Sequence, residues 1–180
     1  MNKLLTISLV ILFLFVSQGF QKAFAQSTPS AQIINVQYDL PYTGLLPDNP
    51  LYFLKALRDN LVGLLITDPV KKSDYDLLMA DKRLSGAAAL LSKGEDDLAI
   101  TTLSKSGNYF YQAIEKVKDA KRQGENINDV VSRLTAASLK HQQIIFQMIN
   151  SANKNTKGTL GAALNRVESF QISAQAIKPN

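Results

Sequence analysis

Apolar residues recur at intervals of three and four along most of the chain after residue 69, and this spacing constrains the fold more than any other feature. In the first such seam, Leu77, Ala80, Leu84, Ala87 and Leu91 fall on one side of a helix. Similar seams run from Ala99 to Val117, from Val130 to Met148 and from Leu160 to Ile177. No stretch of alternating apolar and polar residues competes with them. The sequence therefore predicts an all-α protein.

Turn residues divide these seams into separate helices. Gly94 and Gly124 are expected to end two of them, because glycine readily adopts the positive φ of a helix C-terminus. Residues 150–157 are polar and predict a break before the final helix. Side chains that suit a helix start stand before or within the first turns: Asp68 followed by Pro69, the acidic pair Asp96 and Asp97, and either Asn126 or Asn128.

Residues 38–66 combine a proline-rich segment with the most apolar helical stretch of the chain. The prolines at 41, 47 and 50 favour extended or turned backbone, with Asn49 or Asp48 as the cap of a following helix. Leucines crowd the rest of the stretch, so we expect this helix to be central and nearly enclosed by the others. On that expectation Leu57→Asp costs several kcal/mol, because it places an unpaired charge in the core.

The extended segment before this helix carries large apolar side chains that need cover. We expect residues 38–47 to pack on the helical body as a clasp, with Tyr42, Leu45 and Leu46 covering apolar surface. The alternative is that the segment stays open as a docking edge. The candidate partner-docking residues under that alternative are Tyr38, Tyr42, Leu45, Leu46 and Tyr52. Either way, the predicted architecture is a single-domain bundle of about five helices over residues 37–178.

The same stretch carries a recognisable signature. Residues 40–55 read LPYTGLLPDNPLYFLK, and Asp68-Pro69 with Lys72 follows. This run resembles an uncharacterised family of exported bacterial helical domains, whose pattern is Leu-Pro-Tyr-x-Gly-Leu-Leu-Pro-Asp-x-Pro-Leu-Tyr-x-Leu-Lys. The similarity extends weakly to about Gly124, and Thr43 stands where a proline is commoner. The resemblance implies a helical domain of unknown function and names no activity.

The N-terminus has the features of a secretory signal. Lys3 precedes an apolar run at residues 4–16, and Ala23-Phe24-Ala25 matches a cleavage site. The run is too short to span a bilayer as a stable helix. We therefore expect a signal peptide at residues 1–25, a tether at residues 26–36 and an extracytoplasmic protein that is secreted, periplasmic or at the cell surface, without a stable membrane span. The alternative is an uncleaved N-terminal anchor.

Composition limits the chemistry of the exported chain. There is no cysteine, so neither disulfides nor lipid attachment to a cysteine is available. Loss of Lys3 and Lys22 with the signal lowers the net charge from +5 to +3, which does not suggest nucleic-acid binding. Basic residues dominate after residue 131, which fits either a solvated face or attraction to an anionic wall polymer. Another envelope protein is the other candidate partner.

No pattern indicates catalysis, a cofactor or a metal. His141 is the only histidine, and its place on a seam predicts a hydrogen-bonded core or rim residue. Asp74, Asp76 and Asp81 read as a solvated helix face, and phosphate-binding or nucleophile motifs are absent. We therefore expect a non-enzymatic binding or structural module of the cell envelope. The alternative is an enzyme or small-ligand carrier whose site is dispersed along the chain.

Overall fold

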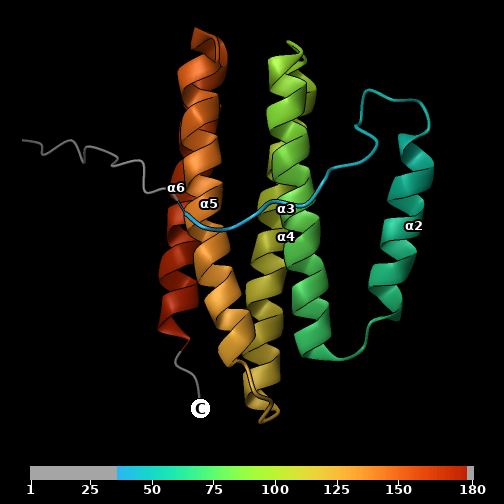
Figure 1. Ribbon diagram of the computed structural model, residues 1–180, viewed down its shortest axis with the longest axis vertical. Coiled ribbons are helices and arrows are strands. Elements are labelled where there is room, and N and C mark those ends of the chain that lie inside the picture. The colour runs from blue at the N-terminus through green and yellow to red at the C-terminus, as the bar shows by residue number, and fades with distance from the viewer. Residues whose placement is uncertain (1–35, 178–180) are drawn as a thin grey trace, which may run out of the picture. The chain divides into compact units, whose positions relative to one another are not determined.

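The computed structural model describes residues 36–177, and these contain five helices and no strand (Figure 1). The helices are α2 (Tyr52–Leu65), α3 (Pro69–Ser92), α4 (Asp96–Arg122), α5 (Asn128–Ser151) and α6 (Lys154–Ala176). The all-α bundle expected from the sequence is confirmed. The predicted signal peptide at residues 1–25 and nearly all of the tether at residues 26–36 lie outside the described residues.

Glycines end α3 and α4 in the same way. Gly94 and Gly124 both have φ of 79° and follow the last turn of their helices. The amide of the next residue, Glu95 or Glu125, donates to a carbonyl five residues earlier, at 3.0 Å in each case. This pairing satisfies carbonyls that the helix end leaves open, so both predicted stops are confirmed.

The starts of the helices follow the sequence less uniformly. Asp68 caps α3 as expected, accepting a 2.9 Å hydrogen bond from the Lys71 amide, with Pro69 in the first turn. The predicted polar break at residues 150–157 is much shorter. Asn153 caps α6 by accepting from the Thr156 amide at 3.0 Å, so the helix takes in most of the polar stretch.

The core lies among α3, α4, α5 and α6. The packing is heaviest between α3 and α4, and α6 packs on both α5 and α4. Leu84, Phe110 and Leu134 are fully buried, one from each of three helices, and the Phe110 ring stacks on Phe170 of α6. The seams predicted for these four helices therefore face one another and complete a core without α2.

The prediction that the first helix is central is wrong. α2 lies on the outer side of α3 and packs mainly on that helix (Figure 1). One further contact reaches α4, where the Tyr109 hydroxyl donates to Asn60 Oδ1 at 3.5 Å. Leu57 is 55% exposed, and Asp59 and Gly63 are the only buried residues of the helix. The physical reason is that α3 to α6 already bury their apolar seams against one another. What α3 offers to α2 is a polar surface, and α2 turns its polar side toward it.

The segment before α2 crosses the bundle in extended form (Figure 1). Tyr38 and Leu40 pack against the core, and Leu46 approaches α3, where a Cβ on Gly86 would lie 3.4 Å from its Cδ2. Tyr42 is 88% exposed and Leu45 is 42% exposed. The segment thus packs on the body through some of its apolar groups, but the expectation that Tyr42 covers apolar surface is wrong.

Candidate functional site

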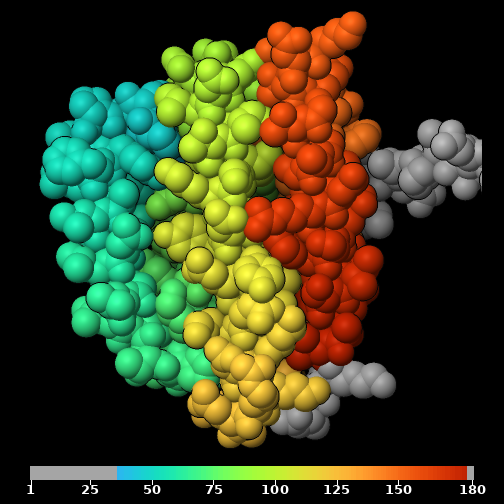
Figure 2. Space-filling model, turned by 180° about the vertical axis from the view of Figure 1, so that it is seen from behind, coloured from blue at the N-terminus to red at the C-terminus, as the bar shows by residue number. Residues whose placement is uncertain are grey.

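The outer face of α2 is an apolar surface that no described residue covers. We use "α2 outer face" for its exposed large side chains: Phe53, Leu54, Leu57, Leu61, Leu64 and Leu65. Leu64 and Leu65 are each 79% exposed. Figure 2 shows the teal side chains of α2 along the outer margin of the view, with the yellow α4 next to them and the red α6 on the opposite side. Soluble proteins seldom leave so many contiguous large apolar groups in water, which marks the face as a candidate interaction site.

The inner face of α2 is polar, which reverses the usual arrangement of an amphipathic helix. Tyr52, Ala56, Asp59 and Gly63 are spaced by four, three and four residues, so they share the side that meets α3. Gly63 allows a close approach there, because a Cβ on it would lie 3.0 Å from the Tyr75 ring. The helix is therefore held to the bundle by its polar side.

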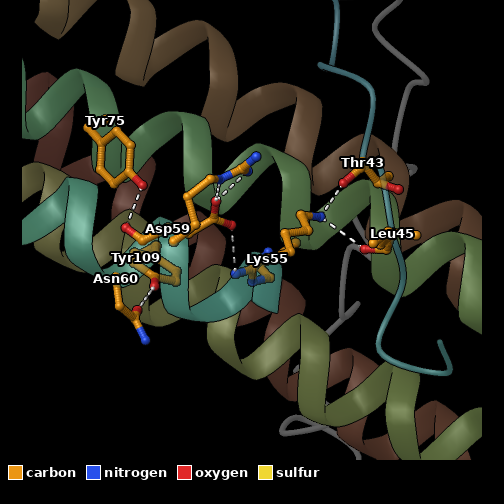
Figure 3. A network of polar contacts seen from close by, with 9 residues as sticks. Thr43, Leu45, Lys55, Asp59, Asn60, Tyr75 and Tyr109 are labelled. Atoms are coloured by element: carbon orange, nitrogen blue, oxygen red, sulfur yellow. Dashed lines mark hydrogen bonds and ion pairs between the residues drawn. The ribbon is translucent and has the colours of Figure 1, made fainter. Parts of the chain in front are cut away.

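Asp59 is the centre of this attachment (Figure 3). Its Oδ1 accepts from Arg58 at 2.7 Å, and its Oδ2 lies 3.6 Å from Nη2 of the buried Arg83 on α3. The Tyr75 hydroxyl donates to the backbone carbonyl of Asp59 at 2.6 Å. Arg83 also lies over the ring of Tyr52, 5.5 Å from its centroid. These contacts fix the rotation of α2 so that its leucines point away from the bundle.

Lys55 ties the extended segment to the same helix. Its Nζ donates to the Leu45 carbonyl at 3.0 Å and to the carbonyl of Thr43 (Figure 3). Burial, with help from the positive charge of Arg83, lowers the pKa of Lys55. This lysine is therefore engaged with backbone of its own chain.

The five candidate docking residues are not gathered on one surface. Tyr42 and Leu45 are exposed on the extended segment, and Leu46 is half-buried against α3. Tyr38 and Tyr52 are also half-buried and point toward partners on α3. The α2 outer face, whose leucines were expected in the core, includes none of these five residues. The leucine spacing did indicate this face in the sequence, but it was interpreted as a buried face and not as an exposed one.

A second polar cluster joins the extended segment to α3 and α5. The Tyr38 hydroxyl donates to Asp81 Oδ2 at 2.6 Å, and His141 Nε2 lies 2.7 Å from Asp81 Oδ1. Burial, followed by the negative charge of Asp81, raises the pKa of the Tyr38 hydroxyl. His141 is 1% exposed, with Phe110 packed edge-on at 5.0 Å between ring centroids. The prediction of a hydrogen-bonded core histidine is confirmed.

The assignment of the α3 aspartates to a solvated face is wrong for two of the three. Asp76 is 0% exposed and Asp81 is 3% exposed, whereas Asp74 stays partly exposed beside Arg133. Burial raises the pKa of Asp76, opposed by its ion pair with Lys72. A sequence signal existed, because both buried aspartates fall at helical spacing from the apolar seam of α3.

A cavity of about 270 Å³ opens beside His141 between α4 and α6. Its walls are mainly apolar, with Leu103, Ile145 and Val167 among them, and His141 and Arg166 also line it. Arg166 Nη2 donates to Asn108 at 3.0 Å. The cavity has the character of a small apolar binding site with one basic group. Within residues 36–177, no three His, Cys, Asp or Glu side chains group as metal ligands.

This geometry defines a class: an all-α bundle that carries one helix with its apolar face turned outward. The chain belongs to the family described as Domain of unknown function (DUF5667), whose model matches residues 44–169. The match starts within the signature stretch and runs well beyond Gly124. Comparisons with curated proteins and with solved structures give no match. No helix in the described part of the chain has the length and apolarity to cross a membrane.

Proposed function

We propose that this chain is an exported helical binding module of the cell envelope, with no catalytic role, which docks onto an apolar helix of a protein partner through the α2 outer face. The observation that carries the proposal is the reversed polarity of α2. Asp59 is 4% exposed on the inner side, whereas Leu64 and Leu65 are 79% exposed on the outer side. A helix held in this orientation leaves its apolar side chains free to pack against another molecule.

The chemistry of the face favours an apolar helix over an anionic polymer. Its exposed members are leucines and one phenylalanine, and the arginine at its edge is already bonded to Asp59. Grooves between leucine side chains accept the side chains of another helix, whereas a polymer of negative charges needs free cations. The signal-like residues 1–25 support an extracytoplasmic location for the interaction.

Photo-crosslinking in living cells tests this function. A photoreactive amino acid at Leu61 is expected to crosslink to an apolar helical segment, identified by mass spectrometry of the joined peptides. The matched control is the same amino acid at Ile172 of α6, which is 68% exposed but isolated from the α2 outer face. Equal crosslinking from both positions, crosslinks to lipid alone, or no crosslink from Leu61 contradicts the proposal.

A second candidate function, carriage of a small ligand, is favoured by the cavity between α4 and α6. Apolar walls with Arg166 and His141 among the lining residues suit a small apolar molecule that bears an acidic group. Solvent extraction of the purified protein is expected to release such a compound. Ala163→Phe fills the cavity from α6, so this variant is expected to release none. Equal amounts from both proteins exclude specific carriage.

A further inference from the structure

We infer that the α2 outer face pairs with the same face of a second copy of this chain, with the two α2 helices antiparallel about a two-fold axis. The inference rests on the proposed use of this face for docking and names its partner. It is carried by the symmetry, the spacing, the area and the charge of the face.

The apolar residues of α2 are arranged symmetrically about position 59. Leu57 and Leu61 lie two residues either side of it, Leu54 and Leu64 five residues either side, and Phe53 and Leu65 six. All six side chains are more than half exposed. In an antiparallel pair related by a two-fold axis, residues equidistant from the axis face each other. The pattern therefore places a large apolar side chain opposite another at every level of the pair.

The spacing along the helix is that of a helix–helix seam. Leu54, Leu57, Leu61 and Leu64 are separated by three, four and three residues, as in the seam of a coiled coil. Antiparallel pairing also sets the positive end of each helix dipole beside the negative end of the other. The spacing therefore suits a helical partner, and the helix dipoles favour the antiparallel direction for a second α2.

The area of the face suits a specific dimer. A standard protein interface takes about 800 Å² from each partner, and six large apolar side chains that are each more than half exposed supply a large share of that area. Because the partner helix is identical, its apolar face has the same length and width as the face that it would cover. No segment among residues 36–177 covers this area within one molecule.

The charges of α2 argue against a lipid surface as the partner. Membrane-surface helices rely on several free lysines and arginines beside the apolar face. α2 has two basic residues, and both are engaged: Lys55 with the carbonyls of residues 43 and 45, and Arg58 with Asp59. The rim of the face is therefore close to neutral. This suits self-pairing, because a rim rich in one charge would face the same charge on the second copy and repel it.

Cysteine crosslinking tests the antiparallel arrangement, and the absence of native cysteine leaves the background clean. In the proposed pair Leu54 faces Leu64, whereas the two Leu54 residues lie about 15 Å apart along the helix axis. Mixing full-length L54C and L64C proteins is expected to give a disulfide dimer that contains one chain of each. L54C alone is expected to give little dimer. Crosslinking of L54C to itself in preference to L64C, or no crosslink in the mixture, overturns the inference.

Sedimentation of the uncrosslinked protein supplies the second readout. The full chain is expected to sediment as a concentration-dependent dimer, Leu61→Glu as a monomer, and the control Ile172→Glu as a dimer like the parent. A parent that is monomeric at all concentrations overturns self-pairing. Failure of the two proposals is separable: Leu61 photo-crosslinks to a helix of a different protein preserve the proposed function and exclude the second copy. Photo-crosslinks to Leu57 of another copy support both.

Discussion

Asp59 of α2 and Arg83 of α3 face each other across the join between this helix and the bundle. Arg83 Nη2 lies 3.6 Å from Asp59 Oδ2, and both side chains are less than one-tenth exposed. The ion pair is supported by Arg58, which bonds the other carboxylate oxygen, and by the Tyr75 hydroxyl on the Asp59 carbonyl. A buried pair in this place fixes which face of α2 is turned outward.

Removal of the Asp59 charge is expected to loosen α2. Asp59→Asn leaves the Arg83 cation buried without a counter-charge, and breaking a buried pair in this way costs about 3 kcal/mol. Urea denaturation measures the change in the free energy of unfolding. The control is Asp48→Asn, which breaks the more exposed pair with Lys93 and is expected to cost no more than about 1 kcal/mol. Equal losses in the two variants contradict a structural role for the buried pair.

The sequence predicted all five helices and the mutual burial of four of them, but it misplaced the first. Two stripes compete on α2: the leucines at 54, 57, 61 and 64, and the polar or small residues at 52, 56, 59 and 63. Apolarity alone selects the first stripe for the core. The side of α2 that is buried depends on α3, because Tyr75 and Arg83 of α3 bond to Asp59 and so bury the second stripe. That information lies in a different helix and no local pattern of α2 contains it.

The buried polar cluster was half predictable. A lone histidine on an apolar seam predicts a satisfied core residue, and His141 is one. Its partner Asp81 lies sixty positions away in sequence, and the third member, Tyr38, lies on an irregular segment. Helical spacing places Asp81 on the seam, but the register of α3 against α5 decides which side chain it meets. Pairings of this kind follow from tertiary packing.

Loss of the Tyr38 hydroxyl is expected to weaken the attachment of the extended segment. In Tyr38→Phe the Asp81 Oδ2 atom loses its hydrogen-bond donor in a buried setting, which costs about 1–3 kcal/mol of unfolding free energy. Thermal or urea denaturation measures it. Tyr42→Phe is the matched control, because that side chain is 88% exposed and is expected to change stability by less than about 0.5 kcal/mol. Equal effects at the two tyrosines argue that the segment is not held by this bond.

Asp76 is expected to make stability depend on pH in a defined direction. Burial raises its folded pKa above 3.8, against the opposing effect of Lys72, so the folded protein holds the proton more tightly than the unfolded chain does. Its stabilising contribution is therefore complete below the unfolded value and is lost as pH rises through the folded pKa. Urea denaturation of the parent and Asp76→Asn from about pH 3.5 to pH 7 measures the difference. The parent's stability relative to the variant should fall as pH rises, and an increase contradicts the assignment.

Leu57→Asp separates a peripheral α2 from a central one. Leu57 is 55% exposed, so an aspartate there stays hydrated, and the unfolding free energy of the monomer is expected to change by no more than about 1 kcal/mol. Leu84→Asp on α3 is the contrasting control, because Leu84 is 0% exposed and a buried unpaired charge is expected to cost more than about 4 kcal/mol.

The two variants are compared by thermal melts at a protein concentration low enough to avoid association. Leu57→Asp is expected to melt close to the parent and Leu84→Asp far below it, or to be unfolded throughout. A large loss in Leu57→Asp under these conditions means that the leucines of α2 are buried within the monomer in solution. A mild effect on the monomer together with loss of the dimer in sedimentation assigns the same leucine to an interface between molecules.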